Sequence, residues 1–172
     1  MKKAQTGFTL LELMMAITVL AILLAIAVPT FGSVIRSNRI ATATNELVTA
    51  LTLARSESMK RGDSVTVCAS DDSALCAGSE DWSTGWIVFV DTDGNGSRGA
   101  GEPLLQAWTA IGAGLALDAS VEFLQYTPTG LTSPVITNGS FELMKPGYGG
   151  DKARCIRIGN TGRVSTERET CT

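Results

Sequence analysis

An apolar run near the N-terminus constrains this chain more than any other feature. The nineteen residues from Leu10 to Val28 carry a single charge, on Glu12. As a helix with a rise of about 1.5 Å per residue, the run is roughly 28 Å long, which matches the hydrocarbon core of a bilayer. It therefore predicts a membrane-spanning helix. A charge inside such a span costs about 2.5–3.5 kcal/mol on insertion scales, so Glu12 is a candidate functional residue.

Two basic residues, Lys2 and Lys3, precede this run, which is also the layout of a secretory signal peptide. A signal peptide, however, ends in a small-residue cleavage site after its apolar region. Here the small residue, Gly7, comes before that region, so a cut there leaves the apolar helix on the mature protein, beginning at Phe8. The alternative interpretation is an ordinary single-pass anchor in which Glu12 has no special role.

The segment Gly7-Phe8-Thr9-Leu10-Leu11-Glu12, after a short basic leader, resembles the class III signal of type IV pilins and type II secretion pseudopilins. In that family a dedicated prepilin peptidase cuts after the glycine, and the new N-terminal Phe is N-methylated. The resemblance implies that Gly7 and Phe8 form the processing site. It also implies that Glu12 pairs with the free amino terminus of a neighbouring subunit. A buried carboxylate is tolerated when a cation meets it, so this pairing agrees with the physical argument.

Helical periodicity continues beyond the apolar run. The apolar positions recur at steps of seven, four and three residues, at Ile40, Leu47, Leu51 and Ala54. We therefore expect one long helix from near Phe8 to Arg61, ended by Gly62 after a basic pair. Pro29 and Gly32 are the expected places for a bend or local melting.

From Ser64 the sequence period changes to two, which predicts strands. Seven candidates are separated by Gly, Asn, Asp and Pro clusters: Ser64–Cys68, Gly85–Val90, Leu104–Trp108, Val121–Tyr126, Ser140–Met144, Arg154–Ile158 and Arg163–Thr166. The expected fold class is α+β, with a long N-terminal helix packed on antiparallel β-sheets as in the type IV pilin fold.

Four segments are expected along the chain. Residues 1–7 form a leader peptide, and residues 8–31 form the transmembrane and assembly half of the helix. Residues 32–62 form its amphipathic half, and residues 63–172 form a C-terminal globular, β-rich domain. After the anchor, about 140 residues remain, which is enough for one domain with its own core.

Beyond the anchor the chain resembles the FimT/FimU (GspH-like) branch of the family. The resemblance rests on Ser37-Asn38-Arg39, Asn45-Glu46-Leu47, Ala54-Arg55-Ser56-Glu57, Val65-Thr66-Val67-Cys68, Asp81-Trp82, Gly85-Trp86-Ile87-Val88-Phe89-Val90-Asp91 and Asn160-Thr161-Gly162-Arg163-Val164. It implies a minor pilin that joins a minor-pilin complex priming type IV pilus assembly. The alternatives are a FimT-like DNA-binding minor pilin for natural transformation and a minor pseudopilin of a type II secretion system. The implied partners are other minor and major pilins, the prepilin peptidase and, before assembly, the inner membrane. The globular domain is expected in the periplasm and later in the pilus at the cell surface.

Charge and composition narrow the function further. Residues 63–142 carry eleven acidic residues against Arg98, a net charge of −10, whereas residues 143–172 carry six basic against three acidic residues, a net charge of +3. The acidic middle argues against general nucleic-acid binding but leaves a local basic patch near the C-terminus. The chain has no histidine, which excludes histidine-based catalysis. We expect no enzyme activity and no cofactor.

The candidate DNA-binding residues are Lys152, Arg154, Arg157, Arg163 and Arg168. DNA-uptake pilins of the FimT type use a Gly-Arg-x-Arg motif in this region. The match here is Gly162-Arg163-Val164, with Ser165 in place of the second arginine, so weak DNA binding is expected. Because side chains alternate along a strand, Arg154, Ile156 and Ile158 are not all expected to point one way. If Ile156 and Ile158 face the core, Arg157 is expected to be exposed with Cys155, while Arg154 joins the opposite face at the start of the strand.

Four cysteines, Cys68, Cys76, Cys155 and Cys171, allow three disulfide pairings. We favour Cys68–Cys76, which closes a short acidic loop, together with Cys155–Cys171, which ties down the last residues. The spacing does not fit a zinc site, and no histidine completes one. The cysteine pairs favour a pilus subunit over a secretion subunit.

A calcium-loop pattern is the remaining candidate site. Asp91-Thr92-Asp93-Gly94-Asn95-Gly96 with Glu102 at the twelfth position matches D-x-[DN]-x-[DN]-G-x5-E. The ligands would be Asp91, Asp93, Asn95, the Ser97 carbonyl and Glu102. A strand leads into the loop and Pro103 follows it, which is not the context of an EF-hand. A polar hairpin turn without a metal is therefore the favoured interpretation.

Overall fold

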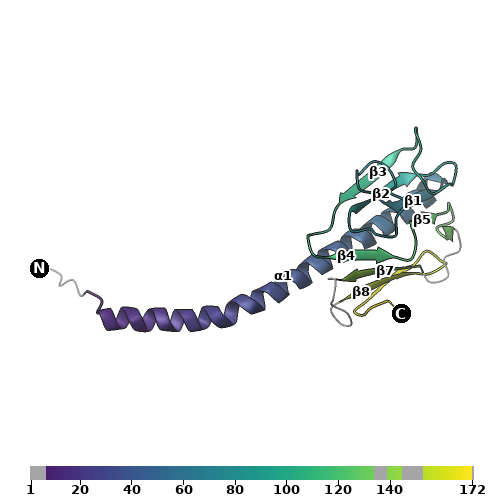
Figure 1. The fold of residues 1–172 in the computed structure, drawn as a ribbon. Coiled ribbons are helices and arrows are strands. Elements are labelled where there is room, and N and C mark those ends of the chain that lie inside the picture. Colours follow the sequence, from purple (N-terminus) through teal and green to yellow (C-terminus); the bar gives the residue numbers. More distant parts are fainter. Residues whose placement is uncertain (1–6, 134–138, 145–152, 172) are drawn as a thin grey trace, which may run out of the picture. The chain divides into compact units, whose positions relative to one another are not determined.

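The structure is a computed structural model that describes residues 7–133, 139–144 and 153–171 (Figure 1). It divides into two compact units, Met1–Asn38 and Arg39–Thr172. A 52-residue helix, α1 (Leu10–Arg61), contributes residues to both units. The backbone keeps its helical assignment through Pro29 and Gly32, so the local melting expected there is not present.

The C-terminal end of α1 is set by residues that commonly end helices. Gly62 adopts a φ of 75°, a left-handed conformation that most residues with a side chain avoid. Its N–H donates to the Ser58 carbonyl over 3.0 Å. Lys60 and Arg61 in the last turn form ion pairs with Glu57, at 3.4 and 2.6 Å. Basic side chains here also interact favourably with the helix dipole.

The strands form two antiparallel sheets. Five strands lie in the order β3-β2-β1-β5-β6, formed by β1 (Val65–Ala69), β2 (Gly85–Val90), β3 (Leu104–Thr109), β5 (Phe123–Tyr126) and β6 (Thr132–Ser133). Four strands lie in the order β4-β7-β8-β9, formed by β4 (Ala116–Ala119), β7 (Gly139–Met144), β8 (Arg154–Ile158) and β9 (Val164–Glu167).

One hydrophobic core joins α1 to both sheets of the second unit. The buried face of α1 is formed by Ile40, Ala43, Leu47, Ala50, Leu51 and Ala54, which includes all four predicted positions. Trp82 packs edge-on against Phe141 from β7, with ring centroids 4.6 Å apart. Because full burial of one large apolar side chain stabilises by about 1.5–3 kcal/mol, this shared core accounts for much of the cohesion of the unit.

The face of the five-stranded sheet opposite the helix is covered by two loops. Cys68, Ile87 and Phe89 form a second, smaller buried cluster there. The Cys68–Cys76 disulfide closes one covering loop, and residues 91–102 form the other, which Asp91 joins to Thr66 and Gln125 through hydrogen bonds. This second cluster follows from the strand period of two, because successive side chains on β1 and β2 alternate between the α1 side and the loop side.

The strand predictions are close but incomplete. The seven expected strands are present with small shifts at their ends, and the five-residue strand Ser64–Cys68 starts instead at Val65. Two strands were not expected, β4 and β6. β4 has the sequence Ala-Leu-Asp-Ala, which has little β-propensity, and β6 has only two residues. Pairing with β7 and β5, rather than local sequence, makes them strands.

Candidate functional site

The predicted processing site lies directly before the first turn of α1. Gly7 and Phe8 are exposed, and 78% of Phe8 is accessible. The rest of the predicted leader lies outside the described residues. The N–H of Glu12 donates to Thr9 Oγ1 over 3.3 Å, so Thr9 acts as the N-cap of the helix. The Thr-x-x-Glu pattern is a capping signal that indicates this role, which the sequence-based expectations did not include.

Glu12 lies in the first turn of an exposed apolar segment. The window Leu10–Ala27 has a mean hydropathy of 2.6, and none of it is buried. It is long and apolar enough to cross a membrane, by length and composition. Glu12 is itself exposed within the single chain, and as an acidic residue in a first turn it interacts favourably with the helix dipole.

The predicted basic residues are divided between the two faces of the β8–β9 hairpin. Ile156 and Ile158 are buried in the core on the α1 side of β8. Arg154 shares that side and borders a groove beside α1, whereas Arg157 forms ion pairs on the opposite side. The predicted alternation of Arg154 and Arg157 is therefore confirmed. The expectation that Cys155 is exposed with Arg157 was wrong, because Cys155 is fully buried, and Arg154 lies on the same side as Ile156 and Ile158. Lys152 lies outside the described residues.

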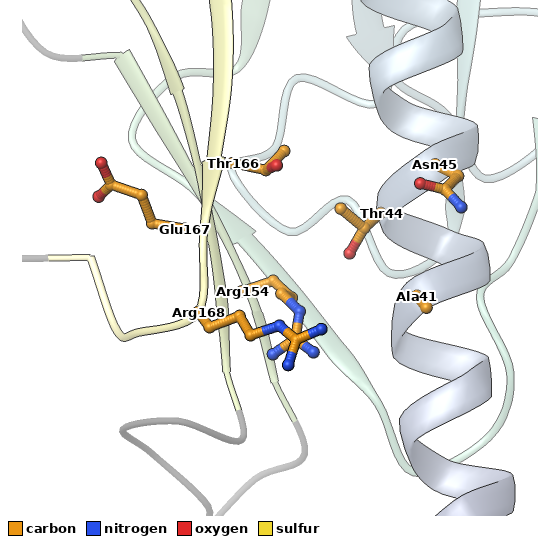
Figure 2. A pocket seen from close by; sticks show the side chains of 7 residues that line it. All are labelled: Ala41, Thr44, Asn45, Arg154, Thr166, Glu167 and Arg168. Carbon is orange, nitrogen blue, oxygen red and sulfur yellow. The ribbon is translucent and has the colours of Figure 1, made fainter.

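The groove on the α1 side has a volume of about 250 Å³. Figure 2 shows the Arg154 and Arg168 side chains extending in the same direction, with α1 forming the opposite wall. The lining residues come from α1, β8 and the end of the hairpin: Ala41, Thr44, Asn45, Arg154, Thr166, Glu167 and Arg168. The groove thus combines two guanidinium groups with hydroxyl and amide groups, a set that suits an anion.

Two ion pairs within the hairpin compensate the positive charge of Arg157. Its Nε lies 3.3 Å from Glu167 Oε2, and its Nη2 lies 3.6 Å from Glu169 Oε1. Arg163 is exposed at the turn, at the opposite end of the hairpin from Arg168. Within the described part of the chain, Arg154 and Arg168 border one groove, whereas Arg157 and Arg163 lie elsewhere on the hairpin, so these candidate DNA-binding residues form no continuous basic track.

The β8–β9 turn is packed tightly against the helix. Arg55 Nη2 donates to the Thr161 carbonyl over 2.8 Å. Gly162 has a φ of 72°, and a Cβ added there would meet the Gly130 carbonyl, the Tyr126 ring and Arg55 Nε. Burial raises the pKa of the Tyr126 hydroxyl well above its usual value. Only glycine fits this position of the turn without displacing the backbone.

Both favoured disulfides, Cys68–Cys76 and Cys155–Cys171, are present. The first closes an exposed acidic loop in which the N–H groups of Leu75 and Ala74 donate to Asp72. These hydrogen bonds hold the pKa of the Asp72 carboxyl below its ordinary value. Because a disulfide restricts the unfolded chain, we expect each to stabilise the unit by about 2–4 kcal/mol.

The residues of the calcium pattern are brought together in part. Carboxylate oxygens of Asp91, Asp93 and Glu102 all lie within 4.8 Å of one another. Asp91 and Glu102 are buried, while Asp93 is exposed. Asn95, another predicted ligand, instead donates its amide Nδ2 to Asp93 Oδ2 over 2.7 Å, and its Oδ1 accepts from the Ser97 N–H at 2.7 Å.

Asp91 organises this loop through hydrogen bonds. Its side chain is 1% exposed. Oδ2 accepts from Thr66 Oγ1 at 2.7 Å, from Gln125 Nε2 at 2.8 Å and from the Gly96 N–H at 3.0 Å. Oδ1 accepts from the Asn95 N–H at 3.2 Å. Asp91 therefore joins two neighbouring strands, β1 and β5, to the loop that follows β2.

Glu102 closes the far end of the same loop. Its Oε1 accepts from the Thr92 N–H at 2.9 Å, and its Oε2 accepts from the Gly99 N–H at 2.8 Å. Arg98 also donates to the Ala74 carbonyl at 2.9 Å, which links this loop to the disulfide loop. The carboxylates thus satisfy backbone donors, as expected for a polar hairpin turn.

Comparison with known families shows the family to which the chain belongs. A family model described as type II transport protein GspH matches residues 43–162, well over half of the sequence. The chain belongs to the GspH family. A second model, the prokaryotic N-terminal methylation motif, matches residues 2–28. Among curated proteins, no relative matches this GspH-family chain.

Solved structures of a pilus subunit and of a secretion subunit are similar to this chain. The type IV minor pilin FimU of Pseudomonas aeruginosa is 27% identical, with a TM-score of 0.62, over 76% of this chain and 89% of FimU. A second crystal form of FimU gives 25% identity and a TM-score of 0.56, over 74% and 91% of the two chains. The minor pseudopilin EpsH from the type II secretion system of Vibrio cholerae shares the fold. Its identity is 14% and its TM-score 0.52, over 76% of this chain and 97% of EpsH.

This GspH-family chain therefore has the type IV pilin fold and is a minor pilin or minor pseudopilin. Its family and structural relatives are structural subunits and not enzymes. The methylation motif and the exposed apolar helix fit a membrane-anchored subunit that assembles with other pilins.

Proposed function

We propose that this chain is a minor pilin that joins a complex of minor pilins priming type IV pilus assembly. The observation that supports it most is the combination of the methylation motif with likeness to FimU, which is described as a type IV minor pilin. A subunit of this kind acts through its surfaces. It is stored in the inner membrane by its apolar helix, with the globular unit on the periplasmic side, until the helix moves into the pilus.

Three residues carry the proposed assembly chemistry. The prepilin peptidase cuts after Gly7, which lies exposed before the helix, and the amino group of Phe8 is then methylated. The carboxylate of Glu12 pairs with the positively charged amino terminus of a neighbouring subunit. In an apolar surrounding, an ion pair of this type is strongly favoured over either charge alone, so it selects one helix register between subunits.

Replacing Glu12 with Ala tests this role. We expect normal cleavage and membrane insertion, because the cut precedes the helix, but at least about tenfold less subunit in sheared pili, as expected for losing a desolvated ion pair worth more than about 1.4 kcal/mol. Glu46→Ala is the matched control, since Glu46 is exposed on the same helix outside the apolar segment. Quantitative immunoblots of pili and membranes give the result. Normal incorporation of the Glu12 variant would contradict the pairing.

A second candidate function is a receptor for DNA during natural transformation. Arg154 and Arg168 beside α1, with exposed Arg163 at the hairpin turn, favour it. The net charge of −10 over residues 63–142 opposes it, because long-range attraction to phosphate would be weak or repulsive. Arg157 forms ion pairs with Glu167 and Glu169, which makes it less available for contact with a DNA phosphate.

A mobility-shift titration of the full-length chain in detergent with duplex DNA checks this alternative. We expect weak binding at physiological salt, in the non-specific range of about 10⁻⁴ M or weaker, and its loss in an Arg163→Gln, Arg168→Gln double variant. Lys60→Gln, a change at the end of α1, is the control. Tight, salt-sensitive binding that the double variant abolishes would instead support the receptor function.

A third candidate is a minor pseudopilin of a type II secretion system. The likeness to EpsH supports the fold alone, at 14% identity. The higher identity to FimU favours the pilus. The neighbouring genes distinguish the two, because a pilus gene cluster would support the first and a secretion operon the second.

A further inference from the structure

Three of the four outer edges of the two sheets are covered, or are short and charged. At β6, the N–H of Thr132 donates to the Asn160 carbonyl over 3.4 Å, so the β8–β9 turn covers that edge. At β4, the N–H of Trp82 donates to the Leu117 carbonyl over 2.8 Å, so the segment before β2 covers that edge. β9 has four residues and ends in a charged one, Glu167. Covering segments, short strands and charges are the usual protection of a sheet edge against pairing with another chain.

The β3 edge lacks these protections over most of its length. β3 lies at the end of the five-stranded sheet (Figure 1), and among the described strands only β2 pairs with it. Its six residues, Leu-Leu-Gln-Ala-Trp-Thr, include no charge and no proline, and Gln106, Ala107 and Thr109 are exposed. The register shift of the β2–β3 pairing lies opposite the start of the strand, so pairing is regular from Gln106 to Thr109. This stretch is therefore an open, uncharged edge.

The backbone groups that face outward from β3 follow from the hydrogen bonds of β2. The N–H of Val90 donates to the Pro103 carbonyl, on the β3 side. Hydrogen-bonding directions alternate along an antiparallel strand, so the β2 residue two positions earlier also faces β3, and its register partner Gln106 bonds inward. The N–H and C=O groups of Ala107 and Thr109 are therefore directed outward, where a strand laid beside β3 would pair with them.

Charge decides which kind of strand fits this edge. The five-stranded sheet and both of its covering loops lie within residues 63–142, which carry a net charge of −10. Two copies of this chain paired edge to edge would bring two such charges together, and like charges across an interface are unfavourable. A segment with positive charge would instead be attracted to this unit.

We propose that the β3 edge is a docking site for an extended, basic segment of a different pilin-type subunit, which adds one more strand to the sheet. The outward main-chain groups of β3 supply the hydrogen bonds, as in other cases of strand addition. The positive charge of the partner favours it over a second copy of this chain. The inference rests on the proposed function, since it needs pilin neighbours.

Photo-cross-linking from β3 tests the docking directly. Benzoylphenylalanine replaces Gln106, which is exposed, in the full-length chain expressed in its own host. Sheared pili and membranes are irradiated, and peptide mass spectrometry maps the linked segment. A second change, Ala107→Pro, removes one outward N–H and leaves the inward hydrogen bonds, as proline can on an edge strand. Ala107→Ser is the matched control, because it keeps the N–H at the same position.

We expect the cross-link to map to an extended segment of another pilin-type subunit with a net positive charge. Ala107→Pro should lower its yield at least about fivefold relative to Ala107→Ser, the factor that corresponds to one net hydrogen bond. Ala107→Lys should also lower the yield, whereas Ala107→Glu should not. These two variants keep the N–H and differ in charge, so the test does not depend on how well the proline variant folds.

Four outcomes would overturn the docking site. Incorporation of the Gln106-substituted chain into pili without an inter-subunit cross-link would do so and leave the proposed function intact. A cross-link to a second copy of this chain, equal yields from the proline and serine variants, or a greater loss with Ala107→Glu than with Ala107→Lys would also do so. Absence of the unmodified chain from pili would overturn both the docking site and the proposed function.

Discussion

A Gly7→Val variant is expected to keep its leader and to accumulate in the membrane as the unprocessed chain. Gly7 is exposed, and a Cβ added there would meet nothing within 4 Å. Valine therefore fits the structure of the chain itself, and we expect the loss of cleavage to arise in the proposed peptidase, which in the resembled family cuts after a glycine. Because uncut chains lack the free Phe8 amino group, they cannot offer that group to the carboxylate of a neighbouring subunit, and assembly should fall below detection.

Intact-mass analysis of the membrane form measures this effect. The unmodified chain should appear as a mature form with methylated Phe8, and the variant with the complete leader. Gly32→Ala is a suitable control, because Gly32 lies in the same helix and also has open space around it. A methylated Phe8 terminus on the Gly7→Val chain would contradict the predicted processing site.

An Asp91→Ala variant is expected to lose about 3–5 kcal/mol of the free energy of unfolding of the β-rich unit. The side chain is buried and accepts four hydrogen bonds, three of them on Oδ2. Removing it leaves buried donors on Thr66 and Gln125 without an acceptor, and each such donor costs about 1–3 kcal/mol. A loss of this size approaches the total stability of a marginal domain.

Guanidinium unfolding of the detergent-solubilised chain, followed by tryptophan fluorescence, measures the change because Trp82 and Trp86 are fully buried. Asp93→Ala is the matched control, since Asp93 is exposed and its hydrogen bonds to described residues stay within the loop. We expect it to change the unfolding free energy by less than about 1 kcal/mol. Equal effects of the two substitutions would show that Asp91 does not organise the loop.

The same assay addresses calcium at this loop. If the loop closes through its own hydrogen bonds, millimolar calcium or a chelator should hardly change the unfolding midpoint. A ligand present at about a hundred times its dissociation constant stabilises by about 2.7 kcal/mol. A stabilisation of that size by calcium, lost in Asp93→Ala, would instead establish the pattern as a metal site.

Features encoded within short segments were predictable from the sequence. The apolar run, the ending of α1 at Gly62 and the buried face of the helix follow from composition, conformational preference and a period of about 3.6 residues. The alternation of Arg154 and Arg157 follows from the strand period of two. Each of these patterns can be read from a short stretch of sequence, without information about distant segments.

Features that depend on distant segments were not predictable in the same way. β4 is a strand because β7 pairs with it, and Asp91 is a structural centre because Thr66 and Gln125 meet it from two other strands. The sequence placed Asp91 in a calcium pattern, which contains no information about those two partners. Likewise, the groove exists because α1 passes beside the end of a hairpin that lies far along the chain.

The packing of Gly162 bears on the use of a Gly-Arg pair in this region as a sequence marker for DNA-uptake subunits. Its positive φ, and the Gly130, Tyr126 and Arg55 atoms that an added Cβ would meet, require glycine for the turn, whatever the hairpin binds. Selection for folding alone would keep that glycine in relatives that never meet DNA. Surveys that seek DNA-uptake subunits should therefore score the arginines of the motif and give its glycine no weight.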